Sequence, residues 1–333
     1  MGKHGLMREA PMVSVVIPTY NRKDMLKECL DSLFNQTYPK DKYEIIVVND
    51  GSTDGTEEVL KEYAKKAPCA FKWFTQQNKG SYAARNLGIK NAKGEIICFT
   101  DDDCIADKRW LEELVRGFTD EGIGGVGGRI IAYNPKTMLE KYVEMDQASE
   151  IRESLYIITC NAAYKKGVLE RVRGFDSYFR SGGDVDMGIR VTLEGYKLKY
   201  ASDAIIYHKH RETLKGLIKQ RYNYGIGAAV LSRKYRYSLI FTQSIIIELL
   251  RLLYLVVALP IKFKNKRLNS IIDIIVTSAY ILGMIKGILF DRYEGKEYRR
   301  GKIKLELFEK KKILNVFFRK LRKWKWRKDR IPP

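Results

Sequence analysis

Three consecutive aspartates, Asp101, Asp102 and Asp103, follow an apolar run in the segment GEIICFTDDDC. Like charges this close raise one another's pKa and repel unless positive charge lies between them. The triplet is therefore either a solvated acidic turn or a site that holds a cation. Carboxylate oxygens suit a hard divalent cation such as Mg²⁺ or Mn²⁺, so the rest of the chain must decide between a turn and a metal site.

The elements around the triplet predict a doubly wound α/β sheet. Short β-branched runs at 13–18 and 44–49 are typical of buried parallel strands, and further strands are expected near 71–75 and 95–100. Apolar residues at helical spacing predict the intervening helices, at 24–36, 54–66, 81–92 and 107–118. Such a fold binds ligands at the carboxyl ends of its strands, where both Asp50 and the triplet fall.

A glycine-rich segment, Gly122–Gly127, matches the GxGxxG pattern of dinucleotide-binding proteins. That motif works only after a strand and before a helix. Here a helical pattern precedes it and the strand-like run VGGRIIAY follows it. We therefore do not expect a dinucleotide site at this segment.

Six motifs resemble, in order and spacing, those of the family 2 glycosyltransferases of the GT-A fold. They are PTYNR (18–22), VVNDGSTD (47–54), NKGSYAARNLGIKNAKGEIICFTDDD (78–103), GFD (174–176), GGDVDMGIR (182–190) and His208. The resemblance covers roughly residues 12–225. It implies an α/β GT-A fold with a mixed, mainly parallel central sheet. It also implies an inverting enzyme that moves a hexose from a UDP- or GDP-sugar to an acceptor hydroxyl.

The resemblance gives the triplet a role in holding a metal ion and the donor. Asp101 and Asp103 resemble the DxD motif, with Asp103 on a Mn²⁺ or Mg²⁺ ion and Asp101 on the ribose or the metal's water shell. His208 matches a family histidine that completes the metal shell. Asp102, between the two, is expected to support the site or shape its turn, and we group it with the nucleotide-sugar-binding residues.

Donor-binding residues are also expected outside the triplet. By the resemblance, Asp50 accepts a hydrogen bond from the nucleobase, and Pro18, Tyr20 and Arg22 line the same pocket. The alternative for Asp50 is an Asx-type turn into the next helix. Arg85 resembles an arginine near the donor phosphates, and its alternative is a solvated charge on a helix.

Asp184 is the candidate general base, which removes the acceptor hydroxyl proton as that oxygen attacks the anomeric carbon. Family motifs often read Glu-Asp here, whereas this chain has Gly183-Asp184, so one possible acceptor contact is missing. The alternative for Asp184 is the N-cap of a helix over 185–194. Asp186 lies four residues before Arg190, and a helical ion pair is sufficient to explain it.

The charge of the chain is strongly positive, with a formal net charge of +21 over 333 residues. Residues 291–330 hold 17 Lys and Arg against 6 Asp and Glu. Such an excess indicates a polyanionic partner, either nucleic acid or an anionic membrane. No RNA- or DNA-binding motif is present, and the basic tail follows two apolar stretches, 239–261 and 271–290. We therefore expect residues 239–333 to contact an anionic membrane surface at the cytoplasmic face, and no nucleic acid to bind.

The apolar stretches are long enough to cross a bilayer, but each carries charge. The first contains Glu248 and Arg251, and the second contains Asp273 and Lys286. Spanning by both would place the basic link 262–267 outside the cell, against the positive-inside tendency. We therefore expect two helices that lie in the cytoplasmic leaflet, with spanning helices and buried packing helices as alternatives. The expected division is a catalytic domain at 1–230 and a helical membrane-associated region at 231–333.

Two other functions compete with glycosyl transfer. A metal-dependent nucleotidyltransferase also uses a sheet edge, two carboxylates and Mg²⁺, but it has no need of a distant base in the motif 182–190. A basic nucleic-acid-binding protein would explain the charge but not the motifs. The start of the chain lacks an apolar signal region, so a cytoplasmic start is expected, and a membrane location favours a lipid-linked or glycan acceptor.

Overall fold

The computed structural model describes residues 10–147, 156–210, 212–235, 238–259, 264–290 and 293. All of them belong to one compact unit, Met1–Gly295. A second unit, Lys296–Pro333, lies outside the described residues. Of the basic tail predicted at 291–333, the described residues include Tyr293 alone.

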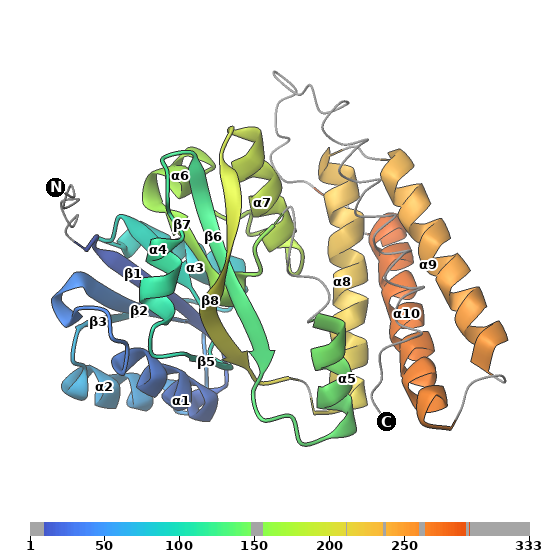
Figure 1. The fold of residues 1–333 in the computed structure, drawn as a ribbon, viewed down its shortest axis with the longest axis horizontal. Coiled ribbons are helices and arrows are strands. Elements are labelled where there is room, and N and C mark those ends of the chain that lie inside the picture. Colours follow the sequence, from blue (N-terminus) through green and yellow to red (C-terminus); the bar gives the residue numbers. More distant parts are fainter. Residues whose placement is uncertain are drawn as a thin grey trace, which may run out of the picture. The chain divides into compact units, whose positions relative to one another are not determined.

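An eight-stranded mixed sheet occupies the centre of the first unit, with the strand order β3-β2-β1-β4-β7-β6-β8-β5 (Figure 1). The strands are β1 (Val13–Thr19), β2 (Tyr43–Asn49), β3 (Ala70–Thr75), β4 (Ile96–Phe99), β5 (Cys104–Ala106), β6 (Ile123–Ala132), β7 (Ala162–Lys165) and β8 (Lys197–His208). Strands β3, β2, β1 and β4 run parallel. Strand β7 is antiparallel to both β4 and β6, β6 is parallel to β8, and β5 is antiparallel to β8. The expected mixed, mainly parallel α/β sheet is confirmed.

Helices cover both faces of the sheet because β1, β2 and β4 are apolar on both sides. They are α1 (Lys23–Phe34), α2 (Thr56–Lys66), α3 (Ser81–Asn91), α4 (Trp110–Arg116), α6 (Lys166–Arg171) and α7 (Gly183–Leu193). Val15 of β1 lies in the core shared with α1, α2 and α4. Val16, which points to the other face, packs in the core shared with α3, α6 and α7. Successive residues of β1 therefore pack in cores on opposite faces of the sheet.

The GxGxxG segment lies mostly inside β6, as the strand-like pattern indicated. Its glycines serve packing, because a Cβ at Gly125 would lie 2.6 Å from the Tyr164 ring, and one at Gly127 would lie 2.7 Å from Ile157. No helix follows this segment directly, since β6 continues to Ala132. The glycines therefore let β6 fit closely against its neighbours.

Four further helices follow β6 and β8: α5 (Met138–Gln147), α8 (Leu214–Tyr235), α9 (Ser238–Ala258) and α10 (Lys264–Phe290). Figure 1 shows α8, α9 and α10 side by side at one end of the sheet. Helices α8 and α10 touch through backbone, because a Cβ at Gly225 would clash with the Tyr280 carbonyl and one at Gly283 with the Tyr222 carbonyl. Small residues that allow such close approach are common between membrane helices. The expected domain boundary at residue 230 falls inside α8, and the division itself stays a prediction.

The charges within the apolar helices face one another. Arg251 of α9 lies 3.3 Å from Asp273 of α10 and 3.5 Å from Glu248. The Tyr142 hydroxyl of α5 also donates a hydrogen bond to Asp273, at 2.6 Å. The Lys286 ammonium lies 5.8 Å from the centre of the Tyr222 ring. The four charges that the sequence places in these stretches thus have partners inside the helical region.

Candidate active site

The expected donor-binding residues Pro18, Tyr20, Asp50 and the aspartate triplet lie at or just beyond the ends of β1, β2 and β4. Asp50 directly follows β2, and the aspartate triplet follows β4 after a single threonine. The Asp50 amide donates a hydrogen bond to the Thr19 carbonyl at the end of β1, at 2.9 Å. Parallel pairing of β1 with β2 and with β4 therefore brings these strand ends to one edge of the sheet.

Each aspartate of the triplet faces a cation that the protein itself supplies. Arg85 donates a hydrogen bond to Asp101 at 2.5 Å. Arg22 bridges Asp102 and Asp103, with its Nη1 atom 2.9 Å and 2.8 Å from their carboxylates. Asp102 and Asp103 are both buried, so the interpretation of the triplet as a solvated turn is wrong. Arg22 and Arg85 therefore compensate the three like charges of the triplet.

Burial dominates the electrostatics of Asp102. It raises the pKa of this carboxyl to about 6, although Arg22 and the Thr19 hydroxyl, 2.8 Å away, favour the ionised form. Asp102 thus faces Thr19 and Arg22, which suits the expected supporting position between the two outer aspartates.

Strand pairing brings His208 to Asp103. Cys104 of β5 lies opposite His208 of β8 in the antiparallel ladder, and the Lys209 amide donates to the Asp103 carbonyl at 2.9 Å. The His208 Nε2 atom lies 3.3 Å from Asp103 Oδ1. Burial lowers the pKa of His208, but attraction to Asp103 outweighs it and raises the value to about 9. The other ring nitrogen, Nδ1, lies 3.1 Å from His210 Nδ1.

Asp103 and His208 fit a divalent metal. Together with Cys104 they offer ligand atoms within 4.8 Å of one another. Burial raises the pKa of the Cys104 thiol well above its ordinary value, so this sulfur stays protonated and is no ligand for a hard cation. A carboxylate oxygen and an imidazole nitrogen remain as a donor set that Mn²⁺ accepts.

Asp50 organises the loop before α3. Its Oδ1 accepts hydrogen bonds from Gln76 Nε2 at 2.7 Å and the Lys79 amide at 2.9 Å, and its Oδ2 accepts one from the Gly80 amide at 2.9 Å. The neighbouring Asn49, not Asp50, makes the Asx-type turn, by accepting the Ser52 amide. An ionised carboxylate offers about four acceptor positions, so Asp50 keeps capacity for one more donor.

The remaining expected donor residues differ in exposure. Pro18 is buried within β1, whereas the Tyr20 side chain beyond the strand is exposed. Arg85 is only 3% exposed, so its interpretation as a solvated helix charge is wrong. Its guanidinium lies 5.3 Å from the Tyr82 ring centre and 6.0 Å from that of Phe175.

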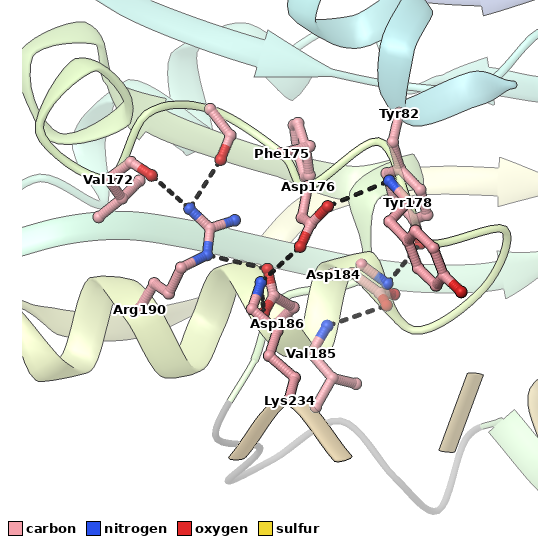
Figure 2. A network of polar contacts seen from close by, with 12 residues as sticks. Tyr82, Val172, Phe175, Asp176, Tyr178, Asp184, Val185, Asp186, Arg190 and Lys234 are labelled. Carbon is pink, nitrogen blue, oxygen red and sulfur yellow. Dashed lines mark hydrogen bonds and ion pairs between the residues drawn. The ribbon is translucent and has the colours of Figure 1, made fainter. Parts of the chain in front are cut away.

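Asp184 lies in the first turn of α7 and is half-buried. Gly182, with φ of 84°, is the N-cap of this helix, so the alternative that Asp184 is the N-cap is wrong. Asp184 Oδ1 accepts the Val185 amide at 3.0 Å, and the Gly183 amide donates to the Tyr82 hydroxyl, also at 3.0 Å (Figure 2). Burial raises the pKa of Asp184, which makes this carboxylate a better proton acceptor.

The predicted Asp186–Arg190 ion pair is confirmed, at 2.8 Å, but it is part of a larger buried network. Lys234 of α8 lies 2.6 Å from Asp186 and 2.7 Å from Asp176 of the GFD segment. Arg190 also donates to the carbonyls of Val172 and Gly174. Sequence reasoning missed Lys234, because nothing in the local pattern of α8 distinguishes it from the exposed lysines of the same helix.

Comparison with known proteins also indicates a glycosyltransferase. Residues 14–181 match the model of the family described as Glycosyl transferase family 2. Glycosyltransferase AglE of Haloferax volcanii is 36% identical over 222 residues, which cover 65% of this chain and 73% of that protein. A Methanococcus voltae protein named dolichyl N-acetyl-alpha-D-glucosaminyl phosphate 3-beta-D-2,3-diacetamido-2,3-dideoxy-beta-D-glucuronosyltransferase is 26% identical over 319 residues, with 83% of this chain and 98% of that protein covered.

A solved structure is similar in fold over most of the chain. The mannosyltransferase PcManGT from Pyrobaculum calidifontis, in complex with GDP-Man and Mn²⁺, superposes with a TM-score of 0.64 at 21% identity, over 86% of this chain and 89% of that one. This likeness shows the GT-A fold. With the family model matching half of the chain, the comparisons show that the chain belongs to glycosyl transferase family 2, as a glycosyltransferase that takes its sugar from a nucleotide sugar.

Proposed function

We propose that the chain is an inverting hexosyltransferase that uses a UDP- or GDP-sugar, with Asp184 as the general base. The observation that carries this proposal is the position of Arg85. It pairs with Asp101 of the triplet, and its charge also opposes the rise in the pKa of Asp184. The triplet and the candidate base therefore both lie near one buried cation, which suits a donor site next to an acceptor site.

On the donor side, we assign the nucleobase to Asp50, Pro18 and Tyr20, and the ribose and diphosphate to Asp101, Asp102 and Arg85. Support for Asp50 comes from its remaining acceptor capacity, which suits a ring N–H of uracil or guanine. Support for Arg85 comes from its burial beside Asp101, since a desolvated guanidinium attracts phosphate oxygens strongly.

Asp103 and His208 are assigned as the residues that hold Mn²⁺ or Mg²⁺. A bound divalent ion would stabilise the negative charge that develops on the leaving diphosphate. Arg22 lies 2.8 Å from Asp103 and holds this carboxylate in place from the strand side. The named ligand of the Pyrobaculum protein, Mn²⁺, supports the choice of ion.

On the acceptor side, Asp184 takes the proton of the attacking hydroxyl, and the sugar inverts because attack comes from the face opposite the diphosphate. Burial favours this role because a desolvated carboxylate has a raised pKa and accepts a proton more readily. Tyr82 holds the start of α7 through the Gly183 amide, so the base is fixed at the helix N-terminus.

We further propose a lipid-linked or glycan acceptor at the cytoplasmic face of a membrane. The catalytic domain is assigned to residues 1–230 and the membrane-associated region to residues 231–333, of which 239–333 contact the membrane surface. One described helix, Leu268–Phe290, is long and apolar enough to cross a membrane. Helix α9 exposes an apolar row on one face, formed by Ile246, Leu249, Leu250, Leu253, Val256 and Val257. Apolar surface of this extent marks a contact with a membrane or a partner. The Methanococcus relative, whose name describes a dolichyl-linked substrate, supports the acceptor class.

The experiment is a screen of GDP-mannose, UDP-glucose and UDP-N-acetylglucosamine with Mn²⁺, read first as thermal stabilisation and then as nucleotide release. A polyprenyl-phosphate sugar and a soluble oligosaccharide serve as competing acceptors. We expect one nucleotide class to raise the melting temperature with the logarithm of its concentration, and transfer to the lipid-linked acceptor with inversion. Retention of configuration in the product would contradict the proposed mechanism.

A further inference from the structure

We propose that Lys234, at the end of α8, is a positioning residue for Asp184, so that the helical region sets the place of the base. This inference rests on the proposed role of Asp184. Lys234 touches neither the strand ends nor the triplet in the contacts of the described residues, so it acts through α7 rather than on a substrate.

The first support is the position of the Lys234 ammonium between two carboxylates. Its Nζ atom lies 2.7 Å from Asp176 and 2.6 Å from Asp186, and its side chain is 3% exposed (Figure 2). Asp186 is fully buried and lies two residues after Asp184 on the same helix. The Tyr235 hydroxyl, also from the end of α8, donates to the same Asp186 oxygen at 2.7 Å. Two side chains at the end of α8 therefore bind the same carboxylate in the first turn of α7.

The second support is charge balance. The network contains two carboxylates, Asp176 and Asp186, and two cations, Lys234 and Arg190, so its formal charge is zero. Burying an uncompensated charge is strongly unfavourable. Removal of the Lys234 charge leaves one excess carboxylate, which must take up a proton or move toward water, and either change destabilises the fold. Charge balance therefore links Lys234 to the stability of the fold, whereas its direct contact with Asp186 holds the first turn of α7 in place.

A second contact between the same elements lies on the other side of Asp184. A Cβ at Gly182 would lie 3.2 Å from Leu231 of α8, and one at Gly227 of α8 would clash with the Ser181 carbonyl. Gly182 and Asp186 flank Asp184, so α8 touches the chain both before and after the candidate base. Helix α8 therefore acts as a two-point support for this turn.

The same network reaches the last described residue. The Tyr293 hydroxyl, just beyond α10, donates to Asp176 Oδ2 at 2.7 Å, and its ring lies 4.9 Å from the Tyr178 ring. Helix α10 in turn packs on α8 through Gly287, where a Cβ would lie 2.6 Å from Ala229. The helices proposed to contact the membrane are thus joined to the base through Asp176, Lys234 and Asp186.

Positioning of this kind has a large effect on rate. A general base must lie within hydrogen-bond reach of the proton that it takes, and a misplacement of about 1 Å can cost roughly 10²-fold in rate. Donor binding, which we assign to the strand ends, does not depend on the place of Asp184. Substitution of Lys234 should therefore lower kcat and leave the affinity for the donor unchanged.

The test compares Lys234→Met with the double variant Lys234→Met/Asp176→Asn, in which one cation and one carboxylate remain. Lys219→Met, at an exposed lysine of the same helix, is the matched control. Melting temperature, hydrogen–deuterium exchange of peptides covering 182–193, affinity for UDP and GDP with Mn²⁺, and release of nucleotide from GDP-mannose and UDP-N-acetylglucosamine are measured in the full chain.

We expect Lys234→Met to lower the melting temperature and the double variant to recover it. Both variants should show faster exchange at the start of α7 and a kcat lower by about 10²-fold, with nucleotide affinity unchanged. Wild-type exchange or wild-type kcat in the double variant overturns the positioning role, because the network then acts only through folding. Full turnover in Asp184→Asn instead overturns the proposed base, which keeps the two failures apart.

Discussion

His208 Nε2 lies 3.3 Å from Asp103 Oδ1, because Cys104 and His208 are paired residues of β5 and β8. Strand β5 directly follows the triplet and pairs with β8, so His208 at the end of β8 lies next to the Asp103 carboxylate. His208 Nδ1 points instead to His210 Nδ1, 3.1 Å away. This contact suits a His208 that donates its Nδ1 proton to His210, while a bound metal would replace the proton at Nε2.

The first prediction concerns this histidine pair. His210→Ala should weaken Mn²⁺ binding by about 10- to 100-fold, the usual effect of losing a residue that orients a metal ligand. His210→Gln keeps an acceptor for the Nδ1 proton and should lose less. Free Mn²⁺ measured by electron paramagnetic resonance gives the affinity without any turnover. Equal Mn²⁺ affinity in wild type and His210→Ala would show that His208 needs no such partner.

The second prediction concerns pH. Asp184 must be ionised to accept a proton, and burial raises its pKa above the ordinary value of 3.8. As pH falls through the raised value, the carboxyl is protonated and kcat should decline on an acidic limb above pH 3.8. Asp184→Asn should lower kcat by several orders of magnitude and remove this limb. The pH–rate profile checks both statements, and an unchanged acidic limb in the variant would assign it to another group.

A third prediction concerns stability far from the site. Glu44 accepts hydrogen bonds from Ser14 at 2.7 Å, Lys72 at 2.8 Å and the Lys93 amide at 2.6 Å. Burial opposes ionisation, but these partners outweigh it and lower the pKa of Glu44. Because the folded pKa lies below the unfolded value, the stabilisation is complete above the unfolded value. It is lost as pH falls through the folded pKa.

Glu44→Gln should therefore lower the free energy of unfolding at pH 7 by about 1–3 kcal/mol and flatten its decline below pH 4.5. Urea unfolding at several pH values measures both effects. Glu57→Gln, at an exposed carboxylate of α2, should change little. If Glu44→Gln has the stability of the wild type at pH 7, the buried carboxylate does not stabilise the sheet as described.

The fourth prediction concerns the membrane. Glutamine at Leu250, Leu253 and Val257, which are exposed on α9, should reduce binding to phosphatidylglycerol vesicles without lowering the melting temperature. Met25→Gln, an exposed apolar residue of α1, is the control. Cosedimentation with vesicles at low and high salt separates the apolar contribution from the charge contribution. Undiminished cosedimentation of the triple variant would direct attention to another surface.

Much of the architecture was predictable because it is encoded locally. The apolar runs that become β1, β2 and β4 end in polar residues, and parallel strands bring those ends to one edge. The helical spacing before and after them likewise places α1, α2 and α3 within a few residues of their observed limits. The pairing of β5 with β8 is not local, so only the resemblance to a family connected His208 with Asp103.

The electrostatic partners were less predictable. The sequence indicated that the three aspartates need positive charge between them. It did not indicate that Arg22, just after β1, and Arg85 of α3 supply this charge. A solvated position on the helix was an alternative for Arg85, and its burial excludes that. Lys234 resembles every other lysine of α8 in the sequence, because its role depends on two carboxylates that distant segments bring to it.

The most direct measurement of the central claim is calorimetric titration of UDP and GDP, each with Mn²⁺, into wild type, Asp103→Asn and Asp184→Asn. Asp24→Asn, at an exposed aspartate of α1, is the control. The proposed division of roles predicts that one nucleotide binds to wild type, to Asp184→Asn and to the control with the same affinity, and that Asp103→Asn loses Mn²⁺-dependent binding. Wild-type binding by Asp103→Asn, or loss of binding in Asp184→Asn, would contradict it.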